Sequence, residues 1–317
     1  MIESTGIPWF ANLLQCPDCA AELITDSNEI CCKRGHSFPT VGAIPIIISE
    51  AKSIFTHAQF EQEEETFFVS TKPWFWRWGK KVAQRVVPNI LDNLRAKQNY
   101  ARLAELLAQR TDPVVLVIGG GTVGMGMEEF IEDKRFRFIE SDVSLAPRTR
   151  IIIDAHDIPL HDHSCDAVVA QGVLEHVIDS DRVVEEIHRV LKPGGYVYAE
   201  TPFMQGGHFA PYDFRRFTAI GHRRLFRRFE TVGEGMAIGP AASALWNFKN
   251  LLVAITPTRR GKTFAGLLAH VFFFVKYLDY VLIDNRKNWD AASLFFFLGR
   301  RSETTISDRE LIELYKP

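Results

Sequence analysis

A run of five apolar residues that leads into a cluster of glycines is the feature that most restricts how this chain can fold. Residues 114–118 read Val-Val-Leu-Val-Ile, which is typical of a strand buried on both faces of a parallel sheet. Gly119, Gly121 and Gly124 follow with the G-x-G-x-x-G spacing, which lets the backbone turn tightly and approach a ligand at a helix N-terminus. The stretch therefore predicts a strand followed by a ligand-binding turn, although any tight strand-to-helix turn can use glycine.

The next part of the chain alternates between strand-like and helix-like segments. The predicted strands are residues 136–140, 151–153, 166–171 and 196–200, and the predicted helices are residues 127–134 and 180–191. Such alternation predicts an α/β fold with a doubly wound, mostly parallel sheet, whose ligand lies at the carboxyl ends of the strands. Asp142 follows the glycine turn by about 20 residues, where a carboxylate is placed to accept hydrogen bonds from a ribose diol. Glu140 is the alternative.

Four segments resemble the class I S-adenosylmethionine-dependent methyltransferases of the type 11 group. They are the glycine turn, residues 154–160, the Val-Leu-Glu-His stretch at 173–176, and the Arg-Val-Leu-Lys-Pro-Gly-Gly stretch at 189–195. Together they cover roughly residues 114–202. The resemblance implies a seven-stranded Rossmann-like methyltransferase sheet, and it displaces the nicotinamide cofactor that the glycine spacing alone would also suit.

The resemblance also implies which residues touch the cofactor. They are Gly119, Gly121, Gly124, Asp142, Asp154, Ala155, His156, Gln171 and Gly172. The glycines would approach the methionine and ribose parts, and the acid after the second strand would accept from the ribose hydroxyls. Residues 154–156 would flank the adenine, and residues 171–172 would follow the methionyl end.

The catalytic residues are less sharply indicated, because the sulfonium is already an activated methyl donor. The protein must place the acceptor in line and, for a hydroxyl acceptor, supply a base. His176, His208 and Asp213 are the candidates for that base, and a neutral histidine would suit neutral pH. Packing beside Glu175 explains His176 equally well. Residues 201–218 resemble the acceptor-side loop of type 11 enzymes that act on small molecules, lipids and surface sugars.

Four cysteines within 17 residues indicate a metal site near the N-terminus. Cys16, Cys19, Cys32 and His36 have the spacing C-x2-C-x12-C-x3-H, and such paired knuckles can close a tetrahedron around zinc. Cys31 could replace Cys32 as third ligand, although the spacing from Cys32 to His36 is tighter. The segment resembles the zinc ribbons of large-subunit rRNA guanine methyltransferases and of the tRNA-methyltransferase activator type. A closed four-ligand site would be structural.

Two further regions complete the expected organisation, with a zinc-ribbon-like domain at 1–50 and the methyltransferase domain at 114–317. Residues 51–113 are predicted to be a helical bridge, with helical spacing over 82–110. Its aromatic residues would form a lid over a ligand or pack the two domains together, and they are Trp74, Phe75, Trp76 and Trp78. The N-terminus lacks the basic and apolar regions of a signal peptide.

A long apolar segment separates the last two predicted strands, which are residues 229–238 and 293–298. Helices are expected at 243–255 and 264–283, within an insertion at about 240–290 that would cap the acceptor pocket, form a homodimer face or lie on a membrane surface. His270, Lys276 and Asp279 argue against a membrane-spanning helix. We expect a cytoplasmic protein, peripheral at the inner membrane face if the insertion binds lipid.

These patterns predict a methyltransferase that modifies a small-molecule, lipid-linked or glycan-linked acceptor, with S-adenosylmethionine as cofactor and a structural zinc. An rRNA or tRNA base methyltransferase is one alternative, but a formal net charge of −2 gives no general attraction for nucleic acid. A non-catalytic cofactor-binding or scaffold protein is another, because Val117 stands where the family usually has an acid and Val123 where glycine is common. An oxidoreductase on the same fold is the third.

Overall fold

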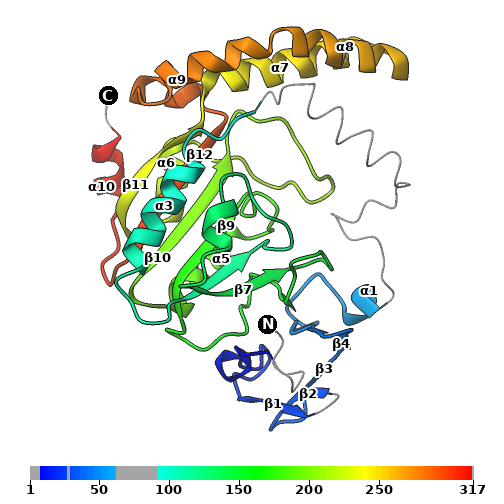
Figure 1. Cartoon of the computed structure of the whole chain (residues 1–317), viewed down its shortest axis with the longest axis vertical. Helices are drawn as coiled ribbons and strands as arrows, with labels where there is room; N and C mark the ends of the chain where they lie inside the picture. Colours follow the sequence, from blue (N-terminus) through cyan, green and yellow to red (C-terminus); the bar gives the residue numbers. More distant parts are fainter. Residues whose placement is uncertain (1–7, 27–28, 62–90, 316–317) are drawn as a thin grey trace.

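The structure is a computed structural model, and it describes residues 8–26, 29–61 and 91–315. The predicted aromatic lid at 74–78 lies outside the described residues, and so does the first part of the helix predicted at 82–110. The remainder of that helix is α3 (Ala96–Leu107). Figure 1 shows one central sheet with helices on both faces, a small N-terminal unit at one end and a layer of helices at the other.

The central sheet has seven strands in the order β11-β12-β10-β9-β6-β7-β8. Their bounds, in chain order, are β6 (Val114–Ile118), β7 (Arg137–Asp142), β8 (Ile151–Ile152), β9 (Cys165–Gln171), β10 (Leu191–Pro202), β11 (Phe229–Ile238) and β12 (Leu294–Arg301). The five strands from β8 to β10 pair in parallel, whereas β12 runs antiparallel to both of its neighbours. The predicted fold class is confirmed, and β11 and β12 form the expected hairpin around the insertion.

Burial on both faces explains why the central strands are uniformly apolar. All five residues of β6 are buried, as the β-branched run predicts. One face packs against α5 (Ser180–Val190) and α6 (Ala219–Leu225), and the other packs against α3 and α4 (Glu128–Ile131). The side chain of Asp179 begins α5 by accepting a hydrogen bond from Arg182 N. The chain ends with α10 (Asp308–Leu314), which begins with a capping box at Ser307 and Glu310.

Two predicted boundaries were wrong by several residues. The helix predicted at 127–134 shrinks to the single turn of α4. The Pro-Gly-Gly segment at 193–195 does not precede β10 but lies inside it, where the register with β9 shifts between Leu191 and Tyr196. Leu191 already pairs with Cys165, so the strand begins before the irregular segment and resumes after it.

The insertion forms a layer of short helices at the end of the molecule opposite the N-terminal unit (Figure 1). Its elements are α7 (Pro240–Ala254), α8 (Arg259–Val271), η2 (Phe273–Leu278), α9 (Asp279–Leu282) and η3 (Arg286–Ala291). The single helix predicted at 264–283 was wrong. The helix is broken between α8 and η2, and two polar side chains beyond the break turn inward. The Asp279 carboxylate accepts from the N–H groups of Ala241 and Ala242, at 2.8 and 3.0 Å. The Lys276 ammonium lies 2.7 Å from Asp92.

The N-terminal unit, residues 8–26 and 29–61, packs on the β8 edge of the sheet. It contains η1 (Ala11–Leu13), β1 (Leu23–Asp26), β2 (Glu29–Cys32), β3 (Ser37–Phe38), β4 (Thr40–Val41), β5 (Ile44–Pro45) and α1 (His57–Glu61). β1 and β2 form an antiparallel pair between the two halves of the cysteine cluster. Ile46 forms a parallel bridge with Ile152, and Ile47 N donates to Ile152 O at 2.9 Å. The unit therefore continues the sheet rather than hanging from it by a linker.

Candidate functional site

The glycine turn leaves β6 and fits closely against the end of β7. Gly119 has φ +71°, a conformation that L side chains rarely adopt. Gly121 N donates to the Asp142 carboxylate at 3.0 Å, and a Cβ on Gly121 would lie 2.6 Å from the same carboxylate oxygen. A side chain at either position would therefore displace the turn from the end of the sheet.

Gly124 is needed for a different close approach, to the side chain of Gln171 at the end of β9. A Cβ on Gly124 would lie 1.8 Å from Gln171 Oε1. That oxygen accepts from the Tyr100 hydroxyl at 3.1 Å, and Gln171 Nε2 donates to Glu200 at 2.9 Å. Burial raises the pKa of Glu200, although Tyr198, Gln171 and Asn93 all donate hydrogen bonds to its carboxylate.

Two adjoining cavities of about 200 and 90 Å³ open at the carboxyl ends of the parallel strands. The residues common to both walls are Phe55, Ile118, Gly119, Asp142, Val143, Val173 and His176. The larger one is also lined by Gly124, Gln171 and Gly172, and the smaller one by Asp154, Ala155 and His156. Except for Gly121, whose backbone contacts Asp142, every residue predicted to touch the cofactor lies on one of these walls.

Asp142 and Glu140, the two predicted partners of a ribose, have different surroundings. The Asp142 carboxylate accepts from Gly121 N and from the Ser144 hydroxyl at 2.9 Å, and burial raises its pKa. Glu140 is absent from the walls of both cavities and pairs instead with Arg148 at 2.5 Å. Only Asp142 is therefore placed to meet a ligand in the cavities.

Asp154 in the smaller cavity accepts hydrogen bonds from two parts of the chain. Its carboxylate accepts from the backbone N–H of His156 at 3.0 Å, from that ring's Nδ1 at 2.6 Å, and from the Ser53 hydroxyl at 2.5 Å. Burial acts to raise its pKa, but these hydrogen bonds outweigh burial and hold the pKa below its usual value. The group is thus an ionised acceptor at neutral pH, as an exocyclic amine requires.

The three residues proposed as bases come together beside the larger cavity. The rings of His176 and His208 are 4.9 Å apart, and the Asp213 carboxylate accepts from His208 N at 2.7 Å. Hydrogen bonds from Arg216 lower the pKa of Asp213 to about 2, so Asp213 does not take up protons near neutral pH. The histidines remain as candidates.

Sequence analysis missed four polar residues that support these groups, namely Ser53, Asn93, Glu175 and Glu200. Glu175 is part of the Leu-Glu-His motif and is 2% exposed, with one carboxylate oxygen 3.7 Å from a ring nitrogen of each histidine. Its position beside His176 in the sequence was the only signal available. The other three act through partners that are distant in sequence.

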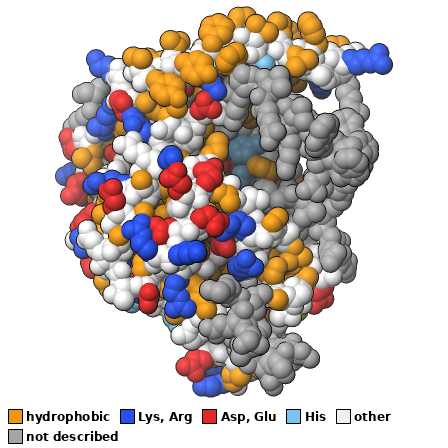
Figure 2. Space-filling model, in the orientation of Figure 1, with side chains coloured by type: hydrophobic (Ala, Val, Ile, Leu, Met, Phe, Trp, Pro, Cys, Tyr) orange, Lys and Arg blue, Asp and Glu red, His pale blue; other side chains and the backbone are white. Residues whose placement is uncertain are grey.

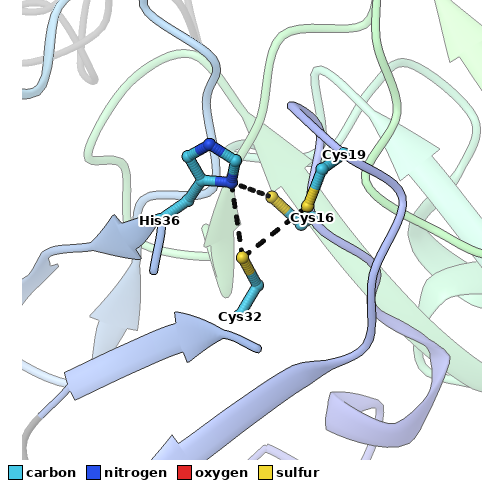
Figure 3. A group of neighbouring side chains, drawn as sticks. All are labelled: Cys16, Cys19, Cys32 and His36. Atoms are coloured by element: carbon cyan, nitrogen blue, oxygen red, sulfur yellow. Dashed lines mark hydrogen bonds between the residues drawn. The ribbon is translucent and has the colours of Figure 1, made fainter. Parts of the chain in front are cut away.

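The four predicted metal ligands converge in the N-terminal unit (Figure 3). Cys16 Sγ and Cys32 Sγ lie 3.4 and 3.3 Å from His36 Nδ1, and Cys19 Sγ lies 3.7 Å from Cys32 Sγ. A tetrahedral zinc ion would separate two thiolates by about 3.8 Å and a thiolate from an imidazole nitrogen by about 3.5 Å. The side chains therefore fit zinc, and Cys31 lies outside the group.

Hydrogen bonds connect the first cysteine knuckle to the smaller cavity. Ser49 donates to Asp18 within the knuckle, and Lys52 donates both to Pro17 O and, at 2.8 Å, to Asp157. Ser53 then donates to Asp154, while Ile54 and Phe55 line the cavity. The N-terminal unit thus forms part of the wall and is more than a neighbouring domain.

Comparison with known proteins finds a similarity in the central part of the chain. A family model described as a methyltransferase domain matches residues 129–199, which run from α4 through β7, β8, β9 and α5 into β10. No curated protein matches the sequence. Together with the strand order, the family match supports an enzyme that transfers a methyl group from S-adenosylmethionine.

Solved structures that resemble the chain include several methyltransferases. A Burkholderia thailandensis 1,6-didemethyltoxoflavin-N1-methyltransferase, with bound S-adenosylhomocysteine, is 16% identical, with 72% of this chain and 84% of that chain covered and a TM-score of 0.41. Phosphoethanolamine N-methyltransferase 2 of Haemonchus contortus is 16% identical, with 65% of this chain and 53% of that chain covered and a TM-score of 0.38. The cyclase SpnF is 19% identical, with 65% of this chain and 81% of that chain covered and a TM-score of 0.40.

Proposed function

We propose that the two cavities hold S-adenosylmethionine and that the chain transfers its methyl group to a small-molecule, lipid-linked or glycan-linked acceptor. The arrangement of Asp142 and Asp154 on adjoining walls carries this proposal. One carboxylate faces the position of a ribose after the second parallel strand, and the other that of an adenine after the third. At each of the three glycines a Cβ would press against a neighbouring side chain, so glycine lets the turn pack closely beside the cavities and leaves its backbone groups near a ligand.

In this proposal each wall residue has a defined role. Gly119, Gly121 and Gly124 let the backbone approach the methionine and ribose, and Asp142 accepts from the ribose hydroxyls. Asp154, Ala155 and His156 surround the adenine, while Gln171 and Gly172 follow the methionyl part. Val117 is a buried strand residue, so this position carries no acid of the kind that the family usually has there. The side chain of Gln171 is held in place by its hydrogen bond to Glu200.

The bound sulfonium supplies an electrophilic methyl group that needs no further activation. The protein therefore has to orient the acceptor and remove a proton where the acceptor is a hydroxyl. His176 and His208 are the groups for this role, since the His176 ring lines the larger cavity and the His208 ring lies 4.9 Å from that ring. Phe55 and Tyr212, whose rings stack at 6.2 Å, shield this part of the cavity from water.

A methyl-transfer screen tests the proposal. Purified protein is incubated with S-adenosylmethionine labelled in the methyl group and with separate lipid, sugar and RNA fractions. We expect label in a lipid or sugar fraction and production of S-adenosylhomocysteine. Label that enters only RNA would instead favour the base methyltransferase, and a protein that binds the cofactor without transfer to any fraction would favour the scaffold.

Within this function, we also propose that Cys16, Cys19, Cys32 and His36 hold a structural zinc ion. Three thiolates and one imidazole leave no open coordination position, so the ion would stabilise the N-terminal unit without taking part in methyl transfer. Because the first knuckle is hydrogen-bonded to the segment that reaches Asp154, the ion would also hold the adenine wall in place.

The insertion provides a surface that favours a lipid-linked acceptor. Its outer side exposes a continuous group of large apolar side chains, here called the apolar cap and visible along the top of Figure 2. The cap consists of Leu251, Ile255, Phe264, Leu267, Leu268, Val271, Phe272, Phe274, Tyr277, Leu278, Tyr280 and Val281. Residues 240–290 carry seven basic and three acidic side chains, an excess that suits an anionic membrane surface.

The insertion that carries the cap also contacts the acceptor loop. In α7 the Ser243 hydroxyl and the Asn247 amide both donate to Met204 O at 3.2 Å, four residues before His208. In the described part of the chain no single helix is long and apolar enough to span a membrane, although one bent pair passes by length and composition. An acceptor held in a membrane surface could thus be presented to the cavity by this layer.

Lipid vesicles test the apolar cap. We expect the protein to float with vesicles that contain phosphatidylglycerol, and the F264E/V281E double variant to bind them at least ~10-fold more weakly because it loses buried apolar area. Ile312→Glu, at an apolar position on α10 that is 56% exposed, serves as control and should bind normally. Equal flotation of all three proteins would contradict the proposal, as would a wild-type dimer that the double variant converts to a monomer.

A further inference from the structure

Three side chains beside the larger cavity direct their ligand atoms at one another. Glu175 and His176 follow β9, and His208 comes from the loop after β10. The Nε2 atoms of both histidines lie 3.7 Å from Glu175 Oε1, and one ligand atom from each of the three side chains falls within 4.8 Å of the others. Glu175 is almost fully buried, whereas the two histidine side chains are partly exposed.

The hydrogen bond of His176 fixes which of its ring nitrogens is free. Its Nδ1 lies 2.5 Å from the carbonyl oxygen of Tyr212. A carbonyl oxygen can only accept, so Nδ1 must carry the proton of the neutral ring. The lone pair of Nε2 is then directed at Glu175.

His208 is held in the same tautomer. Its Nδ1 lies 3.3 Å from Gly206 O and 3.4 Å from Arg216 Nη2. Arg216 Nη2 has two N–H groups, and both are already donated, to Gly206 O at 3.2 Å and to Asp213 at 2.8 Å. The His208 ring therefore donates from Nδ1 to Gly206 O, and its Nε2 also presents a lone pair.

Glu175 adds a negative charge beside the two histidine rings. In residues 8–26, 29–61 and 91–315 its carboxylate has no Lys or Arg partner, and its Oε2 is buried without a hydrogen bond. Three lone pairs that face one another around a buried carboxylate repel unless a cation lies between them. Either a proton on one histidine or a metal ion can supply that charge.

We propose that Glu175, His176 and His208 bind a divalent transition-metal ion on the acceptor side of the cavity. Two imidazoles and one carboxylate suit such an ion better than Mg²⁺ or Ca²⁺, and backbone carbonyls orient both rings, as is usual for metal-bound histidines. In a tetrahedral site, nitrogen and oxygen ligands are roughly 3.4 Å apart, so each distance from histidine Nε2 to Glu175 would have to close by about 0.3 Å from the observed 3.7 Å. A fourth position remains for water or an acceptor.

The ion gives the site a preference for acceptors with an oxygen ligand. A hydroxyl that binds the ion becomes more acidic, so its proton passes to solvent and its oxygen attacks the methyl carbon. The O–CH3 bond forms as the S–CH3 bond breaks, and the sulfonium becomes the neutral thioether of S-adenosylhomocysteine. This acceptor role rests on the proposed function, whereas metal binding does not. With the ion bound, both Nε2 lone pairs are used as ligands, so the ion replaces the histidine base in removing the acceptor proton.

Cobalt titration of the full-length protein distinguishes this site from the cysteine cluster. Protein is purified with its zinc, treated with a weak chelator that removes ions from open sites, and titrated with Co²⁺. We expect one Co²⁺ per chain, with visible d–d absorption but without the intense near-ultraviolet absorption that thiolate ligands give. S-adenosylmethionine binding is measured by calorimetry on the same samples, so a failure of the proposed function shows separately.

Substitutions locate the ion. Glu175→Gln and His208→Ala should each weaken Co²⁺ binding roughly 10- to 100-fold or more, because each removes one of three protein ligands. His270→Ala, in α8, should leave binding within twofold of wild type. Undetectable Co²⁺ binding, or equal binding by wild type and the Glu175→Gln protein, would overturn the proposal. In that event a proton on His208, whose pKa is raised by its contact with Glu175, would be the cation.

Discussion

Asparagine in place of Asp142 is expected to weaken S-adenosylmethionine binding roughly 10- to 100-fold. The carboxylate already accepts from Gly121 N and the Ser144 hydroxyl, and it faces the cavity where we place the ribose. Asparagine keeps one acceptor for the glycine turn but loses the charge that strengthens hydrogen bonds from the ribose. Hydrogen bonds to a charged group contribute about 1.5–3 kcal/mol, which corresponds to this range of affinity.

The same strand provides a matched control. Glu140→Gln removes an acidic group two residues away, but one that pairs with Arg148 outside the cavities. Calorimetry should therefore show affinity within twofold of wild type for this variant. If Glu140→Gln loses the cofactor and Asp142→Asn keeps it, the ribose partner has been assigned to the wrong residue.

The Asp142 carboxylate also predicts a pH dependence of cofactor binding. Burial raises the pKa of Asp142, so its charged form is lost at a higher pH than for an exposed aspartate. The affinity for S-adenosylmethionine should be highest above that pKa and should fall as the pH decreases through it. The Asp142→Asn protein should lack this component of the pH profile.

The second large effect is expected from the metal ligands of the N-terminal unit. Cys32→Ser should abolish zinc binding and unfold that unit, because structural zinc contributes about 10–16 kcal/mol in comparable small domains. Loss of the unit would also remove Ser53 from Asp154 and Phe55 from the cavity wall. Weaker S-adenosylmethionine binding should therefore accompany the loss of zinc.

Cys31→Ser is the control for this experiment, since it removes the adjacent thiol. Cys31 lies outside the ligand group, so the variant should retain one zinc ion per chain after treatment with a weak chelator. Elemental analysis and thermal unfolding compare the two proteins. Zinc that is lost from Cys31→Ser but kept by Cys32→Ser would contradict the ligand set.

Local patterns predicted the parts of the fold that depend on neighbouring residues. The apolar run at β6, its glycine turn and the strand–helix alternation were enough for the parallel sheet, because each segment shows its own burial pattern. The paired cysteine spacings likewise indicated four side chains that lie together in the structure. Such signals are contained within a few residues of one another.

Features that depend on distant contacts could not be predicted. Glu200 fixes Gln171 together with Asn93, which is 107 residues away, and Ser53 reaches Asp154 across 101 residues. After the break between α8 and η2, Lys276 and Asp279 find partners in Asp92 and the start of α7. None of these partners is marked by a periodic pattern or a motif.

Calorimetric titration of the purified protein with S-adenosylmethionine tests the central claim most directly. The two adjoining cavities and their carboxylates predict one cofactor molecule per chain, displaced by S-adenosylhomocysteine and not by NAD. Absence of measurable binding by zinc-loaded, folded protein would contradict the assignment of these cavities, and so would tight binding of NAD in place of the sulfonium cofactor.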